Sequence, residues 1–170
     1  MKKLILPLIM AFIATAAGAQ IRHVPGIKSV DIYYGVSGHG TVVGASFIKY
    51  WKSNLYMKAG GFQESGTDNG ISYQSIGGDF KVARTLLKKS PWFYFNGVAG
   101  ATFSIDQPRE GGQIFNLQSK PKYGALAGVE MEFFISDRFV FFSAWDQRFL
   151  LGSEYGNYRW FGTGGIRFNF

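Results

Sequence analysis

Apolar and polar residues alternate along much of the chain with a period of two, most regularly after residue 92. This period places successive side chains on opposite faces of a β-strand. Segments that contain glycine, serine or asparagine separate the alternating runs, as expected of turns. The pattern predicts eight strands, at residues 27–36, 41–51, 55–64, 71–84, 92–105, 120–135, 138–149 and 158–170.

The connections between the predicted strands alternate between short and long. Short ones occupy 52–54, 85–91 and 136–137, and the others occupy 37–40, 65–70, 106–119 and 151–157. The connection at 37–40 is the one exception, because it is short although it falls among the longer connections. Outer-membrane barrels combine short periplasmic turns and longer extracellular loops with strands of about ten residues. We therefore predict an all-β fold, an eight-stranded antiparallel up-and-down transmembrane β-barrel of the outer-membrane type.

Charged residues in the last four predicted strands share one face, and most of the aromatic residues lie on the other. A water-soluble, lipocalin-like barrel would show the same alternation, but inward aromatics of this size would overfill an eight-stranded interior. A lipid-facing charge at mid-depth costs about 2 to 4 kcal/mol, so we place the charges in the lumen. The predicted lumenal network is structural rather than a transport path, and it contains Asp31, Glu130, Glu132, Asp146, Arg148, Arg159 and Arg167. In the first four strands, Asp31, Lys49, Lys58, Asp79 and Lys81 are also predicted to face inward.

Aromatic residues gather near the ends of the predicted strands, as in the interfacial girdles of membrane barrels. A general preference of aromatics for strands is the simpler alternative. The predicted girdle toward the short turns contains Tyr50, Trp51, Trp92, Phe93, Phe134, Phe139 and Phe170, and the other contains Tyr73, Phe103, Tyr123, Phe149, Tyr158 and Trp160. The last strand must also close the barrel by pairing with the first, because lipid offers no partner to a free strand edge. Its outward residues are predicted to include Trp160, Ile166, Phe168 and Phe170.

The beginning of the chain has the features of a secretory signal. Lys2 and Lys3 precede an apolar run, and Ala17-Gly18-Ala19 supplies small residues for cleavage. We predict a signal peptide at 1–19, an extended lead-in at 20–26 and the barrel at 27–170. Loss of the two lysines lowers the formal charge from +7 to +5, with no block of like charges that would indicate nucleic-acid binding. The absence of cysteine excludes disulfides and thiolate metal sites.

Few residues in the sequence are candidates for chemistry. Ser37 and His39 lie in one predicted tight loop with no orienting acid, so catalysis is not expected. The glycines at 38, 40 and 44 have neither the spacing nor the following helix of a phosphate-binding loop. We predict no metal and no cofactor. A candidate partner-binding loop, which could equally be a plain loop, contains Arg109, Glu110, Ile114, Phe115 and Leu117.

Taken together, several segments resemble the TraO proteins of Bacteroides-type conjugative transposons. The similarity extends over about residues 21–170 and is most evident in 22–27, 59–61, 76–80, 122–152 and 161–170, including Asp137, Arg138 and Arg148. Members can carry cysteines at two positions where this chain has His23 and Phe149, so no disulfide is implied here. The resemblance implies an outer-membrane component of a DNA-transfer apparatus that acts through other apparatus proteins. It implies no catalysis, no direct nucleic-acid binding and no small-molecule substrate.

Two other functions are compatible with the sequence. The first is a stand-alone outer-membrane barrel for adhesion or surface protection, which would recognise surfaces through its loops. The second is an outer-membrane lipid-modifying enzyme, for which Ser37 and His39 would have to act together. All three hypotheses share an outer-membrane location and contact with outer-membrane lipid.

Overall fold

The structure is a computed structural model of the chain, and it describes residues 23–68, 71–108, 121–152 and 157–170. Eight antiparallel strands form a closed barrel in which each strand pairs with its neighbours in sequence. The strands are β1 (Lys28–Ser37), β2 (Gly40–Lys52), β3 (Leu55–Asp68), β4 (Ile71–Ser90), β5 (Phe93–Pro108), β6 (Lys122–Phe134), β7 (Phe139–Leu151) and β8 (Tyr158–Asn169). The predicted all-β, eight-stranded up-and-down barrel is therefore confirmed.

Strand β8 closes the barrel by pairing with β7 on one side and β1 on the other. Ile166 is the register partner of Ile32. Beyond the strand, the Phe170 N–H donates to the Lys28 carbonyl oxygen at 2.9 Å. The chain thus continues its hydrogen bonding to its last residue, which leaves β1 and β8 without a free edge over this seam.

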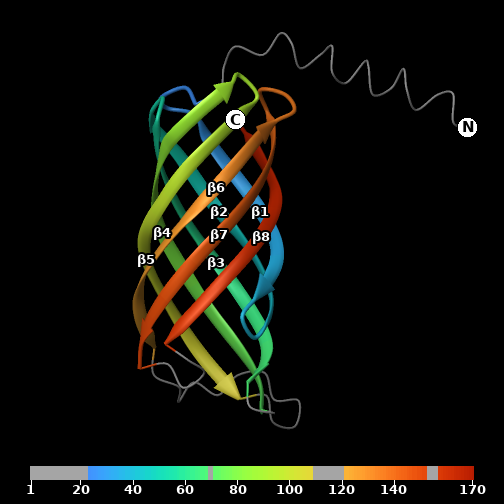
Figure 1. The fold of residues 1–170 in the computed structure, drawn as a ribbon, viewed down its shortest axis with the longest axis vertical. Helices are drawn as coiled ribbons and strands as arrows, with labels where there is room; N and C mark the ends of the chain where they lie inside the picture. Colours follow the sequence, from blue (N-terminus) through green and yellow to red (C-terminus); the bar gives the residue numbers. More distant parts are fainter. Residues whose placement is uncertain (1–22, 69–70, 109–120, 153–156) are drawn as a thin grey trace, which may run out of the picture.

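The two ends of the barrel differ, and we name them by their connections. The turn end holds the connections at 53–54, 91–92 and 135–138 together with Phe170, and it is at the top of Figure 1. The loop end holds the connection at 38–39 and the far ends of β3, β5 and β7. Among the described residues, no helix is long and apolar enough to cross a membrane.

The outer face of the barrel wall is apolar, and charged side chains are buried in the lumen. Exposed outer residues include Ile32 at 63%, Phe141 at 50% and Trp145 at 50%. By contrast, Arg148 and Arg167 are at most 1% exposed. This arrangement is inverted relative to a water-soluble barrel, which buries its apolar face.

Three predicted strand ends are too early, since β3 continues to Asp68 and β5 to Pro108 rather than to residues 64 and 105, and β4 shows the largest difference. Strand β4 does not end at residue 84 but continues to Ser90, so the predicted connection at 85–91 is mostly strand. Register shifts occur between Thr85 and Leu87 and between Lys88 and Ser90. These bulges expose both Leu86 and Leu87 on the outer face. A bulge inserts an extra residue and interrupts the alternation by which a strand is recognised in sequence.

Some side chains lie on a different face from the one predicted. Lys49 is exposed on the outer face, because Ile48 and Tyr50 take the inward positions of β2. The two predicted girdles also included Tyr50, Tyr73 and Phe134, which are at most 4% exposed and point into the lumen. Other predicted girdle members, such as Trp51 and Tyr158, are exposed as expected.

Candidate functional site

The lumen is the most distinctive part of the barrel, and at the turn end five charged side chains from four strands meet in it. Arg167 directs Nη2 to Glu130 Oε1 at 2.5 Å and to Asp31 Oδ2 at 3.4 Å, and its Nη1 contacts Glu132. Lys58 Nζ lies 2.6 Å from Asp31 Oδ2 and 3.3 Å from Glu130 Oε2. We call this group the turn-end cluster.

Tyrosine hydroxyls add hydrogen bonds to the turn-end cluster. Tyr56 donates to Glu130 Oε1 at 2.6 Å, and the Arg167 guanidinium donates to the Tyr50 hydroxyl at 3.0 Å. Both tyrosines are at most 1% exposed. Pairing and hydrogen bonds offset much of the cost of burying these charges, although Asp31 Oδ1 and Arg167 Nε have no hydrogen-bond partner among the described residues.

Residues 23–26 turn back over this end of the lumen, and we call them the N-terminal cap. His23 adopts a φ of 56° and Gly26 a φ of 93°, so this part of the predicted lead-in is not extended. The His23 imidazole is stacked on Tyr94 at 4.2 Å between ring centroids, and its Nε2 lies 2.5 Å from Glu132 Oε2. His23 is 3% exposed, so the cap places a polar ring in the mouth of the barrel.

Replacing His23 with alanine is expected to lower the free energy of unfolding by about 1–3 kcal/mol, because Glu132 would lose a buried hydrogen-bond partner. Urea-dependent unfolding from phospholipid vesicles, followed by tryptophan fluorescence, measures the change. His39→Ala is the matched control, since His39 is only half-buried in the β1–β2 connection. Equal effects of the two substitutions would contradict the role of the cap.

A second group of charges fills the middle of the lumen. Arg148 and Asp79 form a bidentate pair, with Nη1–Oδ1 at 2.9 Å and Nη2–Oδ2 at 2.7 Å. Lys81 contacts Asp146. The Arg148 guanidinium carbon also lies 3.7 Å from the centroid of the Phe161 ring. A guanidinium on an aromatic face is stabilised by a cation–π interaction, and the stacked side chains also fill space in the lumen.

A third group lies toward the loop end. Arg159 Nη2 is 2.7 Å from Asp106 Oδ2, and its Nη1 is 3.0 Å from Glu64 Oε2. The Tyr73 hydroxyl donates to Glu64 Oε1 at 2.9 Å. The three groups together occupy the lumen from one end to the other, as expected of an eight-stranded barrel filled by its own side chains.

The structure brings all seven predicted network residues into the lumen, but not into one network. Asp31, Glu130, Glu132 and Arg167 meet in the turn-end cluster. Asp146 and Arg148 belong to the middle group and Arg159 to the loop-end group. Glu64 was missed, although it lies in phase with inward-facing Lys58, and Asp106 was assigned to a loop because β5 extends further than predicted.

The structure does not assemble a catalytic or metal site from the residues it describes. Ser37 Oγ accepts hydrogen bonds from the Gly40 and His39 N–H groups at 3.0 and 3.4 Å, a turn arrangement that involves the backbone of His39 and not its ring. Within the described ranges, no three metal-ligating side chains converge. The predicted partner residues Arg109, Glu110, Ile114, Phe115 and Leu117 lie outside the described residues.

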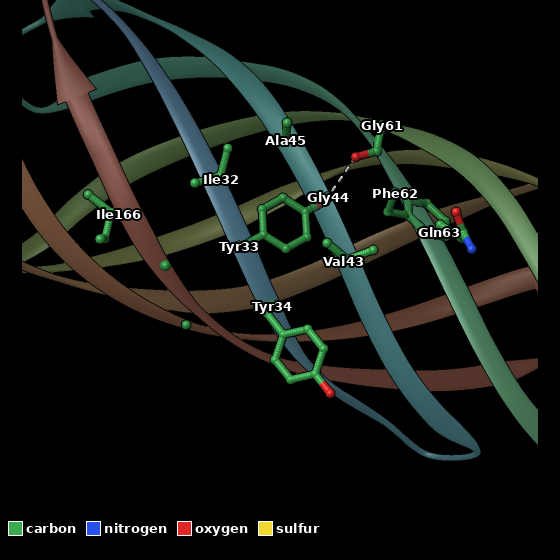
Figure 2. Close-up of a pocket in the computed structure, with 12 residues that line it drawn as sticks. Ile32, Tyr33, Tyr34, Val43, Gly44, Ala45, Gly61, Phe62, Gln63 and Ile166 are labelled. Carbon is green, nitrogen blue, oxygen red and sulfur yellow. Dashed lines mark hydrogen bonds between the residues drawn. The ribbon is translucent and has the colours of Figure 1, made fainter.

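A hollow lies on the outer face of the barrel at mid-height. It has a volume of about 730 Å³ and is shown in Figure 2. Small residues at Ala45, Gly61 and Gly164 form it, and larger ones such as Ile32 and Tyr34 border it. It has no convergent set of polar groups of the kind that orients a small-molecule substrate. The hollow is therefore a feature of the apolar outer wall.

Tyr33 fills the inner side of the wall behind this hollow. Its ring lies where a side chain at Gly44 would be, so only glycine fits there. The Tyr33 hydroxyl donates to the Gly61 carbonyl oxygen at 3.4 Å, drawn as a dashed line in Figure 2. The inward Tyr33 ring thus occupies the space that a side chain at Gly44 on β2 would need.

The predicted outward residues of β8 lie along the same apolar face. Ile166, Phe168 and Phe170 are exposed at 44%, 38% and 61%. Trp160 is half-buried because its ring stacks on Trp145, at 4.7 Å between centroids and 6° between planes. The pair covers the outer side of Gly162.

Comparisons with solved structures show the same fold in small outer-membrane proteins. The N-terminal β-barrel domain of Pseudomonas aeruginosa OprF matches with a TM-score of 0.66 at 10% identity, covering 86% of this chain and 98% of that domain. Neisserial surface protein A matches with a TM-score of 0.65 at 14% identity, covering 85% and 96%. Ail of Yersinia pestis, in complex with a heparin analogue, matches with a TM-score of 0.59 at 13% identity, covering 86% and 100%.

At identities this low, the structural similarity establishes the fold but not the function or the family. No protein-family model matches the chain. No curated protein matches it either. Membership in the TraO family therefore stays a prediction.

Proposed function

We propose that this chain is an integral outer-membrane protein without catalytic activity, and that it serves a conjugative DNA-transfer apparatus through contacts with other proteins. The observation that carries the membrane location is the continuous apolar outer wall around a charged lumen. Ile32 lies in the middle of β1, and Phe141 and Trp145 lie along β7, each at least half exposed. Such a surface in water would be an aggregation site, whereas lipid covers it favourably.

The filled lumen supports a role through contacts rather than through passage. Ion pairs occupy the lumen at three levels, and residues of the N-terminal cap occupy its turn end. Neither DNA nor a small solute would pass without dismantling these pairs. The parts of the barrel left for partner recognition are its two rims and the lipid-facing wall.

The conjugation role rests on the resemblance to TraO proteins, which extends over most of the chain. The conserved fold of OprF, Neisserial surface protein A and Ail supports the membrane barrel but is compatible with several roles.

Deleting the gene is expected to abolish or strongly lower conjugative transfer, and mating frequency between donor and recipient cells measures it. Complementation with the wild-type gene should restore transfer, with the protein recovered in the outer-membrane fraction. The matched control is complementation with His39→Ala, which changes a half-buried residue at the loop end. Unchanged transfer after deletion would remove the conjugation role.

A second candidate function is surface attachment, favoured by one specific comparison. Ail, whose structure shares this fold, is described as an attachment invasion locus protein and was solved with a heparin analogue. In the deletion strain, unchanged mating together with weaker cell attachment would favour this candidate. Unchanged attachment with lost mating would favour the first.

A further inference from the structure

The most exposed charged side chains of the described barrel are of one sign and lie at one end. Seven charged side chains among the described residues are exposed, namely Lys28, Lys49, Lys52, Arg84, Lys88, Lys89 and Arg138. All seven are basic, and all lie toward the turn end, near the connections at 53–54, 91–92 and 135–138 or the first residue of β1. A positive belt of this kind attracts anionic surfaces.

Two of these lysines are placed unfavourably for an isolated protein. Lys28 on β1 and Lys49 on β2 are direct register partners, and both point outward from the wall. Like charges directly opposite each other on neighbouring strands repel. No ion pair between described residues includes either lysine. An anion between the two ammonium groups would relieve the repulsion.

A small apolar hollow continues from this pair along the outer wall. It has a volume of about 240 Å³ and is lined by Lys49, Trp51 and Met57. Met57 is the register partner of Lys49, so Lys28, Lys49 and Met57 form a row across β1, β2 and β3. Trp51 is 64% exposed beside it, and exposed tryptophan is typical of the membrane–water interface.

We infer that Lys28 and Lys49 bind the phosphate of an anionic phospholipid whose acyl chain lies against Met57 and Trp51. The inference rests on the proposed membrane location. The site combines two cations with an adjoining apolar surface, which matches a phospholipid head and tail. It faces sideways from the wall, where lipid is the neighbour, rather than along the barrel axis, where a periplasmic protein would approach. By the short-turn rule for outer-membrane barrels, the turn end meets the leaflet that faces the periplasm.

The test uses the full barrel refolded in zwitterionic micelles, with native mass spectrometry to count bound lipid. Wild type is expected to retain phosphatidylglycerol over phosphatidylcholine by about tenfold or more, given the attraction that two lysines add near an anionic lipid. The variant K28Q/K49Q should lose most of this preference. The control K88Q/K89Q removes the same charge from the same end of the barrel, on β4. This control should retain the preference for phosphatidylglycerol.

Each other outcome overturns the inference. If both double variants lost the preference for phosphatidylglycerol equally, the basic belt as a whole would attract the lipid. If neither variant lost this preference, the lipid would bind elsewhere. A folded wild-type barrel that does not distinguish the two lipids would remove the site but leave the proposed function intact. A wild-type chain that fails to fold in micelles, judged by unchanged gel mobility on heating, would remove the membrane location and this site with it.

Discussion

Replacing Arg167 with glutamine is expected to lower the free energy of unfolding by about 3–5 kcal/mol, the range typical of a broken buried ion pair. Arg167 is fully buried and contacts Asp31, Glu130 and Glu132. Its loss would leave three buried carboxylates with Lys58 as their only permanently charged partner among the described contacts. Urea-dependent unfolding from phospholipid vesicles measures the change.

Two further variants make this expectation specific to the cluster. Arg138→Gln makes the same substitution at an exposed position in the β6–β7 connection, where a change within about 0.5 kcal/mol is expected. Adding Glu130→Gln to the Arg167→Gln variant should recover part of the lost stability, because one unpaired charge is removed with it. Such coupling is what a double-mutant cycle detects between contacting residues. Similar losses for Arg167→Gln and Arg138→Gln would contradict a buried cluster.

Alternation of residues, the lengths of the connections and the limited space inside eight strands were together sufficient to predict the barrel, because side-chain facing in a strand depends on position along that strand. This is why inward Glu130, Glu132, Arg148 and Arg167 and outward Phe141 and Trp145 could be assigned from the sequence. Closure by β8 followed from the need to satisfy backbone groups in lipid. None of these inferences required knowledge of contacts between strands.

The contacts themselves depend on strand register and tilt, which alternation does not determine. Arg167 reaches Glu130 across the lumen, past the intervening strand β7. The His23–Glu132 contact joins residues 109 positions apart and requires a turn with positive φ at a non-glycine residue. No sequence signal distinguishes such a histidine from one in an extended segment.

Errors in facing arose where the alternation is interrupted or weak. The bulges near Thr85 and Lys88 put consecutive leucines on the outer face, so the predicted end of β4 is too early. Lys49 was placed inward because a lipid-facing charge is costly, but it lies close to the turn end. Near an interface the cost falls to about 0–1 kcal/mol, so a lysine is tolerated there.

Introducing arginine at Ile32 is expected to destabilise the barrel by about 2–4 kcal/mol, because this position faces lipid near mid-depth. Ile32 lies in the middle of β1, between register partners Ala45 and Ile166. Arginine at Leu151, the last residue of β7 at the loop end, should cost only about 0–1 kcal/mol. Unfolding from vesicles and the yield of folded barrel both measure the difference.

This pair of variants tests the orientation of the wall because the two positions are otherwise matched. Ile32 and Leu151 are both 63% exposed on the outer face. In water, equal exposure predicts equal and small effects of an added charge, wherever the residue lies along the strand. In lipid, the effects must differ with depth, since only the mid-depth arginine loses its hydration. A difference of about 2 kcal/mol or more therefore supports the hydrocarbon-facing wall, and equal small effects would show that the apolar face meets water.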